Sequence, residues 1–211
     1  MLLNYHYWYF SNVLDENVCN KIIREANRLK DQKAITGHTG RQSNKKFKDL
    51  TKEQKTRLKK TRNSNVVWLN NSWIYELLHP YVKTANVNAG WNFQWERSEP
   101  IQFTKYKLNQ FYDWHQDPFL DLPKEGPFMG LTRKLSTVVT LTDSSEYEGG
   151  ELEFDLRNLS EGTGNNIITC KEILPKGSIV VFPSHIWHRV KPVKKGTRYS
   201  LVMWSNGKPF V

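Results

Sequence analysis

The chain has 211 residues, of which 38% are hydrophobic and 13% aromatic, and it carries a formal charge of +10. This length suits one domain with a sizeable core, and the aromatic content excludes a disordered tail or a fibre. No apolar run approaches the ~20 residues of a membrane span, and the N-terminal stretch LLNYHYWYF lacks the small-residue cleavage site of a signal peptide. Cys19 and Cys170 are the only cysteines, which excludes a thiolate zinc site, favours a reducing compartment and leads us to expect a cytoplasmic protein.

The positive charge is concentrated in residues 30–62. This segment holds twelve lysines and arginines against three acids, and so carries nine of the ten net charges. A block of this kind can contact a polyanion or an acidic partner, but charged segments are usually solvated surface. We therefore expect a solvated arm first, a docking segment for a protein substrate second, and a nucleic-acid contact third.

Helices are predicted in the first ninety residues. Asp15 is suited to cap a helix whose apolar residues follow at helical spacing up to Leu29. Residues 36–50 are polar and read as a loop, and Thr51 with Gln54 resembles a capping box that opens a short basic helix. A third helix is predicted over about 72–84.

Strands are predicted from about residue 91 onward. The segments 101–108, 134–142, 151–155, 178–183 and 198–204 are rich in β-branched and aromatic residues and are separated by Gly, Pro or Asn clusters. Short strands at such spacing favour a β-sandwich or jelly roll. We expect a mainly β (α+β) protein of one domain, 1–211, with a helical part over about 1–90 and a β core over about 91–211.

Three side chains offer a metal site. His115 and Asp117 lie two apart, so on a strand both would point to the same face. His188 follows two or three strands later, while His185, three residues before it, would face the opposite way on a straight strand. Two imidazoles and one carboxylate with open positions form the facial triad of non-haem Fe(II) oxygenases, although a His-x-Asp pair is often only a surface hydrogen bond. Zinc is the competing metal, but no HExxH helix is present.

A carboxylate-binding pocket is predicted around Arg198. On a strand, Arg198, Ser200, Val202 and Trp204 share one face, and a planar guanidinium beside a hydroxyl suits one end of a dicarboxylate. The alternative is a structural arginine paired with a nearby acid.

The motifs together resemble a known family. From about residue 97 to the C-terminus, the chain is similar to the prolyl 4-hydroxylase-like Fe(II)/2-oxoglutarate dioxygenases of the PKHD type. The matching stretches are Tyr106-x-x-Asn109-x-x-Tyr112-x-x-His115-x-Asp117, Arg133-x-Leu135-Ser136, Tyr147-Glu148-Gly149-Gly150-Glu151-Leu152, Pro175-x-Gly177-Ser178-x-Val180-Val181-Phe182-Pro183-Ser184 and His188-x-Val190-x-Pro192-Val193-x-x-Gly196-x-Arg198-x-Ser200-Leu201. Arg62-x-Ser64 and Trp68-Leu69 extend a weaker match toward the N-terminus.

The resemblance implies a fold and a set of ligands. The fold is a double-stranded β-helix, or jelly roll, with the N-terminal helices packed on it. The implied iron ligands are His115, Asp117 and His188. The implied contacts of 2-oxoglutarate are Arg198, which binds its distal carboxylate, and Tyr106, Thr140 and Ser200. The resemblance allows for ascorbate as a reductant.

The resemblance also implies a reaction, in which oxidative decarboxylation of 2-oxoglutarate to succinate and CO2 is coupled to substrate hydroxylation. Peptidyl proline is the substrate it favours, so a protein or peptide is the expected partner. The alternatives are an oxygenase acting on nucleic acid or another substrate, through the basic segment 30–62, and a non-catalytic jelly-roll binding module. Residues 118–130, with three prolines and two glycines, are expected to form a loop over the site.

Overall fold

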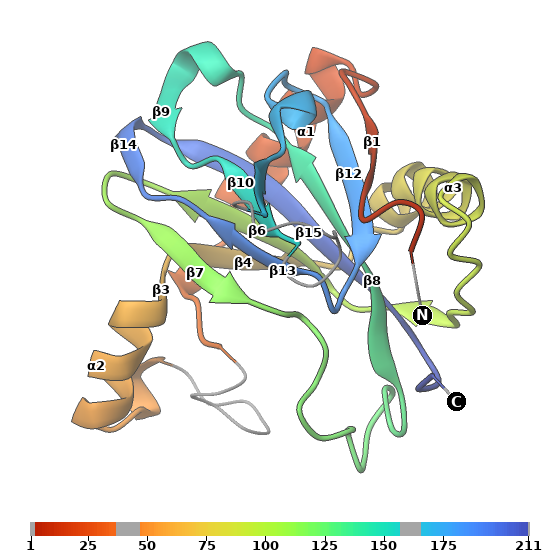
Figure 1. Ribbon diagram of the computed structural model, residues 1–211. Helices are drawn as coiled ribbons and strands as arrows, with labels where there is room; N and C mark the ends of the chain where they lie inside the picture. Colours follow the sequence, from red (N-terminus) through yellow and green to blue (C-terminus); the bar gives the residue numbers. More distant parts are fainter. Residues whose placement is uncertain (1–2, 37–46, 157–165, 211) are drawn as a thin grey trace.

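A computed structural model describes residues 3–36, 47–156 and 166–210, and its architecture is two antiparallel sheets with two of the three described α-helices on one outer face (Figure 1). The α-helices of these residues are α1 (Glu16–Asn27), α2 (Lys52–Thr61) and α3 (Ser72–Asn88). Short 3-10 helices are η1 (Phe47–Asp49), η2 (Ser144–Glu146) and η3 (Lys171–Ile173). None of the described helices is long and apolar enough to cross a membrane.

The larger sheet has the strand order β1-β12-β8-β15-β6-β4-β2, and β5 also pairs with β15. Its strands are β1 (Trp8–Phe10), β12 (Ile179–Pro183), β8 (Thr132–Thr140), β15 (Arg198–Gly207), β6 (Ile101–Tyr106), β4 (Asn65–Leu69), β2 (Gln32–Lys33) and β5 (Arg97–Ser98). The long strands β8 and β15 lie at its centre, with Ser200 opposite Thr140 and Arg198 opposite Tyr106 of β6. This register places the predicted pocket residues side by side.

The smaller sheet has the order β11-β10-β13-β7-β3. Its strands are β11 (Ile167–Thr169), β10 (Leu152–Asp155), β13 (Trp187–Val190), β7 (Phe111–His115) and β3 (Arg62–Asn63). A separate ribbon joins β9 (Tyr147–Gly149) to β14 (Val193–Gly196).

The larger sheet is covered on both faces. On one face α1 and α3 pack their apolar stripes, including Ile22 and Leu78, against β-branched and aromatic side chains of the sheet. On the other face a second apolar cluster joins β12 to β10 and β13, through side chains such as Phe182 and Phe154. The larger sheet is therefore the middle layer. The polar side chains between the two sheets are surrounded by apolar ones.

The predicted helices and core strands are confirmed. Asp15 caps α1 by accepting from the Val18 amide, and Thr51 and Gln54 form the capping box of α2. The third helix runs four residues beyond its predicted end and contains Pro80. The loop expected over 36–50 lies largely outside the described residues.

The N-terminal part differs from the expectation of helices alone, because it also supplies strands β1 to β4. β1 pairs with β12, and β4 pairs with β6 inside the larger sheet, while β3 extends the smaller one. These strands have two to five residues, which is too short for a period-two pattern to be read from sequence. Both sheets thus contain strands from both halves of the chain.

Gly177 is a point where the backbone tolerates no side chain. Its φ is +80°, its carbonyl accepts from the Val13 and Leu14 amides, and a Cβ at this position would overlap the Leu14 carbonyl. Gly90 also has a positive φ, +70°, but a Cβ there meets nothing within 4 Å.

We therefore expect Gly90→Ala to lower the free energy of unfolding by about 1 kcal/mol, the cost of a left-handed alanine. Gly177→Ala should lower it by about 3 kcal/mol or more, because the overlap adds to the same backbone cost. Urea unfolding followed by tryptophan fluorescence measures both. Equal losses would show that the contact of Gly177 with Leu14 does not constrain the fold.

Candidate metal centre

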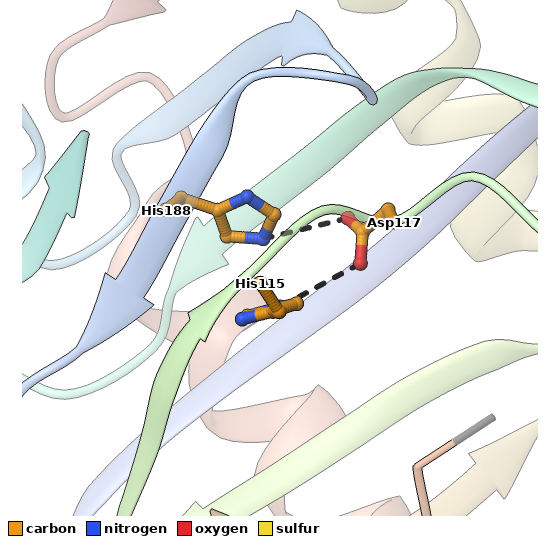
Figure 2. A group of neighbouring side chains, drawn as sticks. All are labelled: His115, Asp117 and His188. Atoms are coloured by element: carbon orange, nitrogen blue, oxygen red, sulfur yellow. Dashed lines mark ion pairs between the residues drawn. The ribbon is translucent and has the colours of Figure 1, made fainter. Parts of the chain in front are cut away.

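The three predicted metal ligands converge between β7 and β13. His115 ends β7, Asp117 follows it, and His188 on β13 lies opposite His115 (Figure 2). The Nε2 atoms of His115 and His188 lie 3.7 Å and 3.5 Å from the two carboxylate oxygens of Asp117. One ligand atom from each residue falls within 4.8 Å of the others, which is close enough for all three to bind one ion.

A β-bulge in β7 aims the side chains at this point. The register shifts between His188 and Val190, so that β7 has one residue more than β13 over the same length. Such an extra residue re-aims the side chains that follow it. As a result Tyr112 and His115, three residues apart, lie on the same face with their rings stacked at 3.5 Å.

Both imidazoles are held in the tautomer that a metal needs. Nδ1 of His115 lies 2.8 Å from the Asp113 carbonyl, and Nδ1 of His188 lies 2.9 Å from the Ile186 carbonyl. A carbonyl oxygen only accepts, so each Nδ1 carries the proton and donates it. Each Nε2 is left as a lone-pair donor facing Asp117.

Asp117 is buried and fixed by hydroxyls. Its Oδ2 accepts from Ser136 Oγ at 2.7 Å, and Ser136 in turn lies 2.9 Å from Ser184 Oγ. Burial alone would raise the pKa of Asp117, but His188, His115 and Arg133 outweigh it and lower this pKa to about 2. The carboxylate is thus ionised at neutral pH.

His115 is held in its neutral form. Burial, followed by the neighbouring His188, lowers the pKa of the His115 imidazole well below its usual value. The cluster therefore presents two neutral nitrogens and one anionic oxygen, with hydrogen bonds behind each ligand. This donor set fits a divalent first-row metal ion.

His185 is separate from the cluster. Its carbonyl accepts from the Gln116 side chain, and its ring lies against Phe210 with centroids 6.4 Å apart. The expectation that only one of His185 and His188 joins the ligand set agrees with this geometry.

The predicted carboxylate pocket lies on the face of β15 that turns toward the smaller sheet. Arg198 is 2% exposed, and its Nη1 donates to Ser200 Oγ at 3.3 Å. Tyr106 faces it from β6, with its ring centroid 5.7 Å from the guanidinium, and Thr140 lies opposite Ser200 on β8. Thr104 of β6, opposite Ser200 on the other side, also joins the pocket and was missed from sequence.

Arg198 has no acidic partner among the described residues. Other buried or half-buried arginines do: Arg133 makes two contacts of 2.6 Å with Glu99, and Arg189 pairs with Glu153. The alternative of a structural arginine held by a nearby acid therefore finds no acid here. A buried guanidinium surrounded by hydroxyls is the arrangement that a ligand carboxylate would complete.

Aromatic and cationic side chains lie next to the metal cluster. The Arg133 guanidinium lies 3.8 Å from the Trp204 ring and 4.8 Å from that of Phe119 in the 118–130 loop. Trp68, 41% exposed, approaches Trp204 with centroids 6.4 Å apart. The loop is ordered by its own backbone bonds and exposes Leu120 and Met129.

The described part of the basic segment lies beside β7, the strand that carries His115. α2 packs on β3 and β7, away from the other two helices (Figure 1). Its residues Lys52, Arg57, Lys59 and Lys60 are exposed, and within the described residues none forms an ion pair. Arg41, Lys45 and Lys46 lie outside the described residues.

A sequence profile of the 2OG-Fe(II) oxygenase superfamily matches residues 101–206, half of the chain and the whole of the metal cluster and the Arg198 pocket. The chain belongs to the 2OG-Fe(II) oxygenase superfamily. Iron is thereby preferred over zinc, and 2-oxoglutarate is the dicarboxylate that the pocket would receive.

Named relatives of this superfamily are similar to the chain. A PKHD-type hydroxylase of Synechococcus sp. (strain CC9902) is 37% identical over 110 residues, which cover 51% of this chain and only 41% of that protein. One of Idiomarina loihiensis is 24% identical over 196 residues, covering 92% of this chain and 74% of that protein.

Solved structures share the fold. A Pseudomonas putida prolyl-4-hydroxylase matches 98% of this chain and 95% of its own with a TM-score of 0.64 and 18% identity. The viral collagen prolyl hydroxylase of Paramecium bursaria Chlorella virus-1 matches 97% of each chain, with a TM-score of 0.61 and 19% identity. The chain therefore has the double-stranded β-helix fold predicted from its sequence.

Removing a ligand should abolish iron binding. We expect His188→Ala to weaken anaerobic Fe(II) binding by more than about a hundredfold, since losing even a hydrogen-bond partner of a ligand costs roughly 10–100-fold. His185→Ala, three residues away, is the matched control and should bind as the parent does. Equilibrium dialysis measures both, and the reverse pattern would transfer the ligand role to His185.

Proposed function

We propose that this chain is an Fe(II)/2-oxoglutarate-dependent dioxygenase that hydroxylates prolyl residues of a protein or peptide. The observation that carries the proposal is Arg198, a buried guanidinium for which the described residues provide no acidic partner. It lies on the same face of the larger sheet as the hydroxyls of Ser200 and Thr140. A binding module without chemistry has no use for this pocket next to three metal-binding side chains. That argues against the third alternative.

The proposed roles follow from the contacts. His115, Asp117 and His188 would hold Fe(II), which together with 2-oxoglutarate and O2 supplies oxidative decarboxylation and the transfer of one oxygen atom to a C–H bond. The Asp113 and Ile186 carbonyls orient the two imidazoles, and Ser136 orients the carboxylate.

The rest of the pocket would orient the cosubstrate and exclude water. Arg198 and Ser200 would bind its distal carboxylate, with Thr140 as a further hydroxyl donor. Burial raises the pKa of Tyr106, so that its phenol stays protonated and can donate to the same ligand. Phe154 and Phe182 pack beside His188 and keep bulk water from this side of the site.

A prolyl substrate is supported by the names of the relatives and by the surface beside the site. The relatives are called PKHD-type hydroxylases, and one structural neighbour is a prolyl hydroxylase of Trichoplax adhaerens in complex with a peptide fragment of hypoxia inducible factor. Trp68, the half-buried Tyr112 and the exposed Leu120 and Met129 of the 118–130 loop offer apolar surfaces on which a peptide with a proline ring can pack.

An oxygenase acting on nucleic acid is the second candidate. The observation in its favour is the exposed basic face of α2 beside β7. Phosphate contacts of this kind need only exposed cations, and an acidic protein would use them equally well. We therefore rank a protein substrate above nucleic acid.

We also propose that residues 1–211 act as one domain, because both sheets contain strands from both halves of the chain.

One panel assay separates these candidates. With Fe(II), 2-oxoglutarate, ascorbate and air, we expect proline-containing peptides to stimulate succinate formation and to gain the mass of one oxygen atom, while methylated oligonucleotides do neither. His188→Ala is the inactive control. Oligonucleotide-dependent succinate that falls steeply with salt would favour the second candidate, and a parent chain without 2-oxoglutarate binding would leave only the binding module.

The cosubstrate role of Arg198 is tested separately. Arg198→Met should raise the KM for 2-oxoglutarate by more than about a hundredfold, because losing one partner of a desolvated ion pair costs about 3–5 kcal/mol. Arg198→Lys, which keeps the charge, should lie between parent and Met variant, and Fe(II) binding should persist in both. An unchanged KM would exclude Arg198 as the carboxylate ligand.

A further inference from the structure

Arg62 is a second buried guanidinium near the metal cluster, and no role has been assigned to it so far. It begins β3, directly after α2, and lies opposite Tyr112 of β7. The residue is 6% exposed. Its Nε donates to Ser64 Oγ at 3.0 Å, while its Nη2 is buried and has no hydrogen-bond partner among residues 3–36, 47–156 and 166–210.

The charge of Arg62 is uncompensated within the part of the chain that the structure describes. No carboxylate lies within ion-pair distance of it, whereas Arg133 has Glu99 and Arg189 has Glu153. Arginine cannot lose its proton in a protein, so burial cannot be relieved by neutralisation as it can for lysine. A buried charge without a partner is costly, and an orphaned donor of this kind indicates an acceptor supplied from outside the chain.

Arg62 lies close to the metal ligand His115. Its guanidinium lies 4.3 Å from the centroid of the Tyr112 ring, and that ring stacks at 3.5 Å on His115. A charged group bound at Arg62 would thus sit two stacked groups away from the metal ligand His115. Arg198, which lies opposite Tyr106, already accounts for the cosubstrate carboxylate, so Arg62 remains for the second reactant.

We propose that Arg62 is a specificity-determining residue that binds a carboxylate of the substrate, carried close to the carbon that is hydroxylated. This rests on the proposed function and narrows its substrate class to prolyl substrates with an adjacent negative charge. The carboxylate belongs either to an acidic side chain beside the proline or to the proline itself as a free acid. A phosphate of nucleic acid fits less well, because phosphate contacts along a strand use exposed cations such as those of α2, not one enclosed guanidinium.

The test uses pairs of probes that differ by one charge. Binding is measured by anaerobic calorimetry on the chain loaded with Fe(II) and 2-oxoglutarate, so that it does not depend on turnover. One pair is a peptide with Pro-Glu and the same peptide with Pro-Gln, and the other pair is L-proline and L-prolinamide. The variants are Arg62→Met, Arg62→Lys and, as a matched control, Arg24→Met, which removes the same charge from the exposed face of α1.

We expect the parent to prefer the charged member of one pair by about tenfold or more, since a desolvated charge pair is lost when either partner is truncated. The pair that shows the preference identifies the source of the carboxylate. Arg62→Met should abolish the preference without weakening binding of the neutral member, Arg62→Lys should keep part of it, and Arg24→Met should keep all of it.

Four results would overturn the proposal. Equal affinity of the parent for both members of both pairs would show that the chain does not recognise a carboxylate of the substrate. A preference that survives in Arg62→Met would assign it to another cation. Weaker binding of 2-oxoglutarate to Arg62→Met would assign Arg62 to the cosubstrate, and Arg62-dependent binding of an oligonucleotide would replace the carboxylate by a phosphate. Charge-dependent binding without hydroxylation would instead reject the proposed function and keep the inference.

Discussion

The pairing of β7 with β13 is the constraint on which the whole site depends. It sets His188 opposite His115. The bulge in β7 between Tyr112 and His115 turns these two side chains to the same face. A shift of β13 by one residue would turn His188 and the buried Val190 to the outer face, because side chains alternate along a strand. The apolar cluster between the sheets therefore fixes the register, and the register in turn fixes the metal geometry.

Compensation of buried charge explains how the remaining polar residues are arranged. Between and around the sheets, acids and arginines are enclosed in pairs, as Glu99 is with Arg133 and Glu153 with Arg189. Asp117 has two imidazoles and a hydroxyl, an arrangement completed by a divalent cation. Among the described residues, Arg198 and Arg62 contact hydroxyls and aromatic rings and no acid. Asp117 is thus suited to bind a cation, and Arg198 and Arg62 are each suited to bind a carboxylate, as proposed above.

The sequence predicted the core strands and the metal cluster because both rest on local patterns. His115 and Asp117 are close in the chain, and the motif around His188 and Arg198 is continuous enough to be recognised. The roles of Arg62, Ser136 and Thr104 could not be assigned in this way, because the residues they contact or pair with lie 19 to 96 residues away in the chain. The two-residue strand β3, which carries Arg62, is too short to show the alternating pattern of a strand. Only its pairing with β7 places Arg62 beside the metal cluster.

The residues proposed to bind the metal and 2-oxoglutarate lie in a different part of the chain from those proposed to recognise the substrate. Residues 101–206, which match the superfamily, contain every side chain proposed to hold the metal or 2-oxoglutarate. Arg62, Trp68 and the basic helix α2 precede this stretch, yet β3 pairs with β7 in the smaller sheet and β4 pairs with β6 in the larger one, which places these residues beside the site. A common oxidising centre needs the same residues whatever it oxidises, whereas recognition of a substrate must differ from one enzyme to the next. We therefore propose that the N-terminal strands carry the residues that distinguish the substrate of this chain, while the β core carries those of the shared reaction.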